Sequence, residues 1–390
     1  MSATMDNNRA AAAGGKRYLW LWGAVVALLP VIGGTLAWLT GWDAMWFFAP
    51  VFLYVIVPAA DYIVGEDSSN PDESAVQALE QDRFYRWCTY AFIPVQYAVV
   101  VWGAWLVGGG TLSWVALIGL TWSMGILSGV AINTAHELGH KKPTIEKWLA
   151  RIALAPVAYG HFYVEHNKGH HRRVATPEDP ASARMGETLY QFMPRTVLGS
   201  LASAWEIEKT RLARQGKSVW HPENENLQSW SMTVLLFGAL TAAFGWAVLP
   251  FLLIQAAIGA SLLETVNYIE HYGLLRHKTA EGRYERCQPR HSWNNNHIVT
   301  NVLLYHLQRH SDHHAHPTRR YQALRHFEEA PQLPTGYAGM IVLAAIPPLW
   351  FRVMDPKVVA HHEGDLRQAH LHPAKADSLL DRYTASAAAT

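Results

Sequence analysis

Cysteine is scarce in this chain of 390 residues, which contains only Cys88 and Cys287. Two cysteines so far apart provide no disulfide framework, no C-x-x-C zinc site and no ligand set for an iron–sulfur cluster. Charged residues are also few, at 16% of the chain against roughly a quarter in soluble domains. The formal net charge of +1 gives no reason to expect a nucleic-acid partner, and we predict none.

Apolar residues, in contrast, make up 50% of the chain and are concentrated in long runs. A membrane-spanning helix needs about 20 mainly apolar residues. Six runs meet this requirement, at residues 18–39, 44–64, 90–108, 113–135, 231–249 and 251–268. The last two are close enough to form a helical hairpin with its turn near Pro250. We therefore predict an all-α integral membrane protein with six transmembrane helices.

The distribution of lysine and arginine predicts the orientation. Basic residues occur before the first run, between the second and third runs (Arg83 and Arg86), and in larger number after the fourth and sixth. The short turns at 40–43 and 109–112 contain neither lysine nor arginine. The positive-inside rule then places both termini on the cytoplasmic side. We expect a disordered tail at 1–15, a membrane catalytic domain at 16–355 with a cytoplasmic cap formed by 136–230 and 271–355, and a polar tail at 356–390.

Nine histidines lie in four motifs at the ends of the predicted spans or in the cap. These motifs are HELGH, EHNKGHH, NYIEHYG and RHSDHH, and their histidines are His136, His140, His166, His170, His171, His271, His310, His313 and His314. Residues three or four apart share one face of a helix, so each cluster can direct two or three imidazoles at one point. Imidazole is the commonest metal ligand, and protonated imidazoles packed together without a metal would repel each other. The pattern predicts a metal centre in the cap.

The number of histidines narrows the choice of metal. A zinc site is complete with three or four ligands, whereas nine suggest two ions of higher coordination number. Iron fits this pattern best and copper is the alternative. HELGH also matches the H-E-x-x-H signature of zinc metalloproteases, with Glu137 as the general base. A zinc protease therefore stays open, although it does not account for the two clusters that end in HH. A metal transporter is a further alternative, but it should have charged or histidine residues within several spans, whereas these histidines lie at or beyond the membrane boundary.

Carboxylates beside the histidine clusters are candidates to orient the ligating imidazoles through their second ring nitrogen. They are Glu137, Glu165, Glu270 and Asp312. Asn133, three residues before His136, is a further candidate to support a ligating histidine without binding the metal itself. A carboxylate that bridges the two metals is an open alternative.

The motifs HELGHKK, EHNKGHH, NYIEHYG and LQRHSDHHAHPTRRYQ resemble those of the membrane alkane 1-monooxygenases, the AlkB-type alkane hydroxylases of the histidine-box diiron superfamily. The resemblance implies that the nine histidines bind two non-haem iron ions and that O2 is the co-substrate. It implies hydroxylation of the terminal methyl of medium-chain n-alkanes to 1-alkanols, in the bacterial inner membrane. Electrons are then expected from rubredoxin, reduced by an NADH-dependent rubredoxin reductase. A fatty-acyl desaturase or hydroxylase of the same histidine-box type is the alternative.

Two further sets of residues follow from this chemistry. An alkane has no polar group, so we expect an apolar channel among the first four spans that opens within the bilayer. Its candidate lining residues, on the second span, are Leu53, Tyr54, Ile56 and Val57. Basic residues beside the clusters are candidates to dock an acidic rubredoxin: Lys168, Arg172, Arg173, Arg319 and Arg320.

Overall fold

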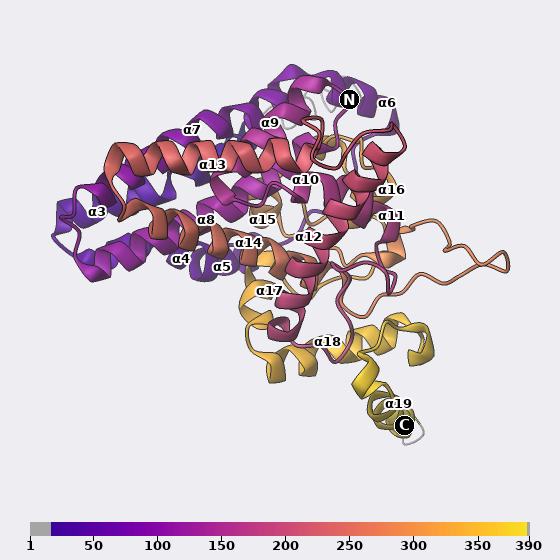
Figure 1. The fold of residues 1–390 in the computed structure, drawn as a ribbon. Coiled ribbons are helices and arrows are strands. Elements are labelled where there is room, and N and C mark those ends of the chain that lie inside the picture. Colours follow the sequence, from indigo (N-terminus) through magenta and orange to yellow (C-terminus); the bar gives the residue numbers. More distant parts are fainter. Residues whose placement is uncertain (1–16, 388–390) are drawn as a thin grey trace, which may run out of the picture.

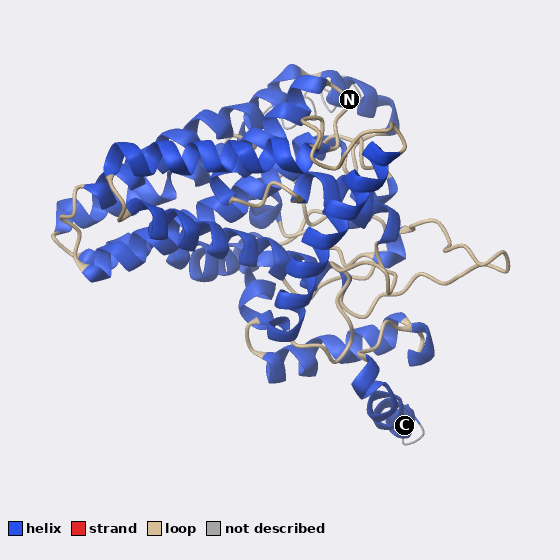
Figure 2. Ribbon diagram, in the orientation of Figure 1, coloured by secondary structure: helices blue, strands red, loops and turns tan. Residues whose placement is uncertain are grey.

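The computed structural model describes residues 17–387, and this part of the chain is helical with no β-strand (Figures 1 and 2). Six segments are long and apolar enough to cross a membrane, which confirms the predicted number of spans. The first span, Arg17–Thr40, contains α2 (Trp22–Val25), η1 (Val26–Leu28) and α3 (Leu29–Thr40). The second, Asp43–Val64, contains η2 (Asp43–Phe47), α4 (Phe48–Val51), η3 (Phe52–Ile56) and α5 (Val57–Val64). The other four spans are single helices: α7 (Arg83–Gly108), α8 (Trp114–Gly139), α13 (Glu225–Phe244) and α14 (Val248–His271). The predicted tail at 1–15 lies outside the described residues.

The turn between the last two spans differs from the prediction. Helix α13 ends at Phe244, and α14 already begins at Val248, so Pro250 lies in the first turn of α14. Proline is tolerated there because the first N–H groups of a helix have no partner within the helix. The chain reverses at Gly245, whose φ of 96° suits a residue without a side chain.

Helices α8 and α14 form the centre of the bundle, with α7 and α13 beside them (Figure 1). Gly125 and Gly129 of α8 face Ile258 and Leu262 of α14, and a Cβ atom at either glycine would collide with these side chains. The two glycines therefore allow the helix axes to approach closely. Both helices end with histidines, so their close packing brings His140 and His271 to the same end of the bundle.

The remaining elements gather at that end and form the cap. They are α6 (Glu73–Gln81), α9 (Thr144–Leu154), η4 (Ala155–Val157), α10 (Phe162–Val164), η5 (Glu165–His170), α11 (His171–Arg173), α12 (Leu189–Ala213), η6 (Pro289–His291), α15 (Ile298–Leu303), α16 (His310–Ala315), η7 (Tyr321–Ala323), α17 (Tyr337–Ala344), α18 (Pro347–His361), η8 (Leu366–Gln368), η9 (Pro373–Lys375) and α19 (Ala376–Ala387). Residue 356, the predicted start of the polar tail, lies within α18. Leu366 and Leu379, beyond it, are buried in one hydrophobic core with Trp350 and Met354.

Candidate metal centre

The nine motif histidines converge in the cap as two adjoining groups. The first group contains five of them, His136, His140, His166, His171 and His313. The second contains four, His170, His271, His310 and His314. Within each group, the potential ligand nitrogens all lie within 4.8 Å of one another. Each group can therefore hold one metal ion, and the pair can hold two.

The separations between ring nitrogens match those of donor atoms around a shared ion. In the first group, His171 Nε2 lies 3.1 Å from the Nε2 atoms of both His166 and His313. In the second, His310 Nε2 lies 3.3 Å from His271 Nε2 and 2.8 Å from His314 Nε2. Metal–nitrogen bonds of about 2.1 Å at right angles place neighbouring donors about 3.0 Å apart. The two sites thus have the dimensions of a coordination sphere.

Unpartnered nitrogens point to the same conclusion. The Nε2 atoms of His136, His140 and His170 are buried, and none has a hydrogen-bond partner within the described residues. A buried polar atom left without a partner costs about 1–3 kcal/mol, so such atoms are rare in native structures. Metal ions bound in the two groups would satisfy all three.

The protonation states also suit metal binding. Burial, reinforced by the neighbouring imidazoles, lowers the pKa well below the usual histidine range at six positions outside the spans: His140, His166, His171, His310, His313 and His314. These imidazoles are therefore neutral near pH 7, and the neutral ring is the form that donates a lone pair to a metal.

Helical spacing predicted the grouping only in part. His136 and His140 share the first group, and His310 and His314 share the second, as expected for residues four apart. His166 and His170 are also four apart, yet they belong to different groups. The reason is that η5 is a π-helix, whose wider turn brings residues five apart together, so His166 shares its group with His171.

Within the described residues, three of the four predicted carboxylates form no hydrogen bond with any of the nine motif histidines. Each forms an ion pair with a nearby cation instead: Glu137 with Lys141 at 3.1 Å, Glu165 with Arg173 at 2.8 Å, and Asp312 with Arg319 at 2.7 Å. The prediction overlooked the basic residues that follow each cluster and that compete successfully for these carboxylates. Asn133 Nδ2 donates to the Leu304 carbonyl and likewise contacts no motif histidine.

Asp179, which was not predicted, hydrogen-bonds a motif histidine. Its Oδ2 lies 2.9 Å from His170 Nδ1, and both side chains are buried. Burial by itself raises the pKa of Asp179, but the His170 ring and the Ser182 hydroxyl outweigh it and lower the pKa to about 2. Asp179 is therefore an anion that accepts from His170 Nδ1–H and leaves Nε2 free for a metal. No local motif marked this residue, because it lies in a loop nine positions beyond His170.

An apolar cavity extends from the membrane region to the histidines. Among its lining residues are His136 and His166 of the first group and His310 of the second. A second apolar cavity, which reaches Val26 and Leu29, lies beside the first. The two cavities share four lining residues, namely Leu53, Val130, Leu304 and Ile341. A separate groove on the outside of the bundle shares Leu262 and Ile341 with the first cavity.

The four candidate channel residues lie in different places in the structure. Leu53 lies where the two cavities meet, Val57 lines the second cavity, and Tyr54 lines the outer groove. Ile56 lines none of the three and is 41% exposed on the outside of the bundle. The predicted helices also need correction, because the inner cavity is formed mainly by the second, fourth and sixth spans together with the cap. The sixth span enters because α14 packs directly against α8.

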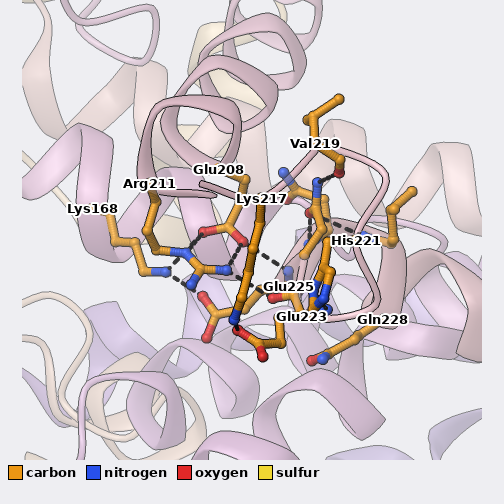
Figure 3. A network of polar contacts seen from close by, with 12 residues as sticks. Lys168, Glu208, Arg211, Lys217, Val219, His221, Glu223, Glu225 and Gln228 are labelled. Atoms are coloured by element: carbon orange, nitrogen blue, oxygen red, sulfur yellow. Dashed lines mark hydrogen bonds and ion pairs between the residues drawn. The ribbon is translucent and has the colours of Figure 1, made fainter. Parts of the chain in front are cut away.

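Four of the five docking candidates are engaged within the protein. Lys168 pairs with Glu208 and Glu225 in a polar network between η5, α12 and α13 (Figure 3). Arg173 and Arg319 bind the carboxylates named above, and Arg320 contacts Glu146 at 2.9 Å. Arg172 is the one exposed residue of the five, and its side chain has no acidic partner within the described residues. Sequence proximity to the clusters did not reveal these internal partners, which come from distant parts of the chain.

Comparison with known proteins agrees with this site. The fatty acid desaturase family model matches residues 112–344. The alkane 1-monooxygenases of Ectopseudomonas oleovorans and Acinetobacter baylyi are each 50% identical to this chain, over 96% and 94% of its length and 93% and 91% of theirs. The xylene/toluene monooxygenase hydroxylase component of Pseudomonas putida is 30% identical over 60% of this chain and 63% of its own length. The chain therefore belongs to the alkane 1-monooxygenase family, within the wider fatty acid desaturase family.

Proposed function

We propose that this protein is a membrane non-haem diiron monooxygenase that hydroxylates the terminal methyl of medium-chain n-alkanes to 1-alkanols. The observation that carries the proposal is the apolar cavity whose inner end is lined by histidines of both groups. The five- and four-histidine groups would each hold one iron ion. Identity of 50% to alkane 1-monooxygenases over nearly the whole chain supports the same activity.

The net reaction inserts one oxygen atom of O2 into the terminal C–H bond and releases the other as water, with two electrons and two protons consumed. Bound iron would supply the activation of O2. The cavity side chains bind the alkane through apolar contact, worth about 0.8 kcal/mol for each buried CH₂ group. Because the substrate has no polar group, selection of the chain terminus would depend on the shape of the cavity near His136 and His310.

Metal analysis and product analysis together test this function. Purified protein should contain two irons per chain and convert members of an octane-to-hexadecane panel to 1-alkanols when an electron-donor system is supplied. One zinc per chain with peptide cleavage would instead support the protease alternative. Desaturated or hydroxylated fatty acyl products, with no alkanol from the alkane panel, would support the acyl alternative.

Leu53 is expected to limit the length of alkane that the protein accepts. In Leu53→Trp, the larger side chain fills the junction of the two cavities, and overpacking costs about 1–3 kcal/mol for chains that must pass it. The yield from hexadecane relative to octane should fall about tenfold, since about 1.4 kcal/mol corresponds to that factor. Ile56→Trp, on the outside of the same span, is the control and should leave this ratio unchanged. Equal ratios in both variants would remove Leu53 from the substrate path.

The proposal extends to location and electron supply. We place the protein in the bacterial inner membrane with both termini and the cap on the cytoplasmic side, as the distribution of lysine and arginine indicates. Rubredoxin, reduced by its NADH-dependent reductase, would deliver electrons to the cap. Of the five residues predicted to dock the electron donor, Arg172 has the exposed side chain that can contact an acidic protein.

Charge reversal should separate docking from structural roles. Arg172→Glu should slow electron transfer from rubredoxin severalfold at low salt, with the difference shrinking as salt is raised, and leave thermal stability unchanged. Lys168→Glu should instead lower the free energy of unfolding by about 1–3 kcal/mol, because it leaves the buried Glu208 with one cation fewer. Stopped-flow reduction and thermal melts measure the two effects. Equal reduction rates for wild type and Arg172→Glu at low salt would exclude Arg172 from docking.

A further inference from the structure

Glu270 is unlike the other carboxylates beside the histidine clusters. Glu137, Glu165 and Asp312 each pair with a lysine or arginine, whereas no such cation pairs with Glu270 within the described residues. Its side chain is 2% exposed, and its Oε1 atom accepts no hydrogen bond. The Tyr337 hydroxyl approaches this carboxylate without forming a hydrogen bond of good geometry. A buried carboxylate without a cation is costly, so either a bound proton or a metal ion must neutralise it.

The position of Glu270 indicates where such a metal ion would lie. Its Oε2 is 3.1 Å from His310 Nε2. That nitrogen faces the second group, since it also lies 3.3 Å from His271 Nε2 and 2.8 Å from His314 Nε2. When His310 Nε2 binds a metal it carries no proton and cannot donate to Glu270. Two lone-pair atoms 3.1 Å apart repel each other unless a cation lies between them.

The two groups also differ by one ligand. The first offers five imidazoles and the second four. The separation between Glu270 Oε2 and His310 Nε2 equals the roughly 3.0 Å expected for neighbouring donors around one ion. The Glu270 carboxylate is not among the atoms of the four-histidine group that all lie within 4.8 Å of one another, so coordination requires its side chain to move toward the group.

We propose that Glu270 coordinates the metal ion of the four-histidine group, which gives that ion four nitrogen ligands and one carboxylate oxygen. This inference rests on the proposed diiron function. The two ions would then differ chemically, one with five neutral ligands and the other with an anionic ligand. Glu270 also lines the alkane cavity, so the carboxylate-bound ion is one of those facing the substrate.

Iron binding in Glu270→Gln tests the proposal. The substitution keeps the shape of the side chain and removes its charge, so affinity for one of the two irons should fall by at least about tenfold. In Mössbauer spectra of protein loaded with ⁵⁷Fe, one of two quadrupole doublets should change and the other should stay. Two irons of wild-type affinity with both doublets unchanged would overturn the proposal. A wild-type protein without two irons would instead overturn the diiron function itself.

Glu264→Gln is the matched control, because Glu264 is a buried glutamate of the same helix. It accepts hydrogen bonds from Tyr159, Thr196 and Asn267 and does not line the alkane cavity. Its substitution should leave iron affinity and both doublets as in wild type.

A further measurement does not depend on any variant's folding. Infrared difference spectra of wild-type protein with and without iron, labelled with ¹³C in its glutamate carboxyl groups, should show a shifted carboxylate band, and the absence of any shift would refute coordination.

Discussion

His313→Ala and His314→Ala are each expected to reduce the iron content from two ions to one per chain, but to remove different ions. The two residues are adjacent in α16, yet His313 belongs to the five-histidine group and His314 to the four-histidine group. Neighbouring residues of a helix point about 100° apart, so the pair divides between two sites. Activity should fall more than about 100-fold in both variants, because the reaction needs the complete centre.

Spectroscopy distinguishes the two losses. Each variant should retain one Mössbauer doublet, and the retained doublets should differ. His316→Ala is the matched control from the same motif, since His316 contacts Asp312 and belongs to neither group. This control should keep two irons and most of the activity. Identical spectra for the His313 and His314 variants would show that the two histidines bind the same ion, contrary to their places in different groups.

Asp179→Asn is expected to weaken iron binding by about 10- to 100-fold at the four-histidine group alone. This is the usual effect of removing a group that hydrogen-bonds a metal-ligating side chain. The Asp179 carboxylate holds His170 Nδ1–H at 2.9 Å and so directs Nε2 toward the group. An asparagine preserves the size of the side chain, but it can turn its amide N–H toward the ring and favour the wrong tautomer. Activity should fall in proportion to the lost iron and recover in part with excess iron.

Iron titration with a competing chelator measures this effect. Asp355→Asn is a suitable control, because Asp355 is also a buried aspartate but accepts from the hydroxyls of Tyr272 and Tyr383, and within the described residues it hydrogen-bonds none of the nine motif histidines. It should bind both irons normally even if its stability decreases. Full iron affinity in Asp179→Asn would mean that the packing around His170 is sufficient to orient its ring.

Local patterns in the sequence were enough to predict several features. Six apolar runs predicted six spans, because the thickness of the membrane sets the length of each run. The four histidine motifs predicted a metal-binding cluster, because nine imidazoles at helical spacing have few other uses. The structure brings all nine together, and the family comparison agrees with the motifs. Leu53, predicted from its position on the second span, lines the apolar cavity, and its part in substrate binding stays a prediction.

Other features depend on parts of the chain that meet only after folding. The π-helical geometry of η5 separates His166 from His170, and no spacing rule for an α-helix predicts this. Asp179 reaches His170 from a loop, while Lys168 reaches acidic partners on α12 and α13.

The sequence by itself therefore determined the membrane class and the histidine set, because both depend on periodicity along one segment. Tertiary structure alone decided how the histidines divide between two groups, which carboxylates contact them, and which helices enclose the cavity. Those outcomes depend on competition between side chains that are distant in sequence. Asp312 illustrates the reason: it lies between two motif histidines, yet the folded chain pairs it with Arg319.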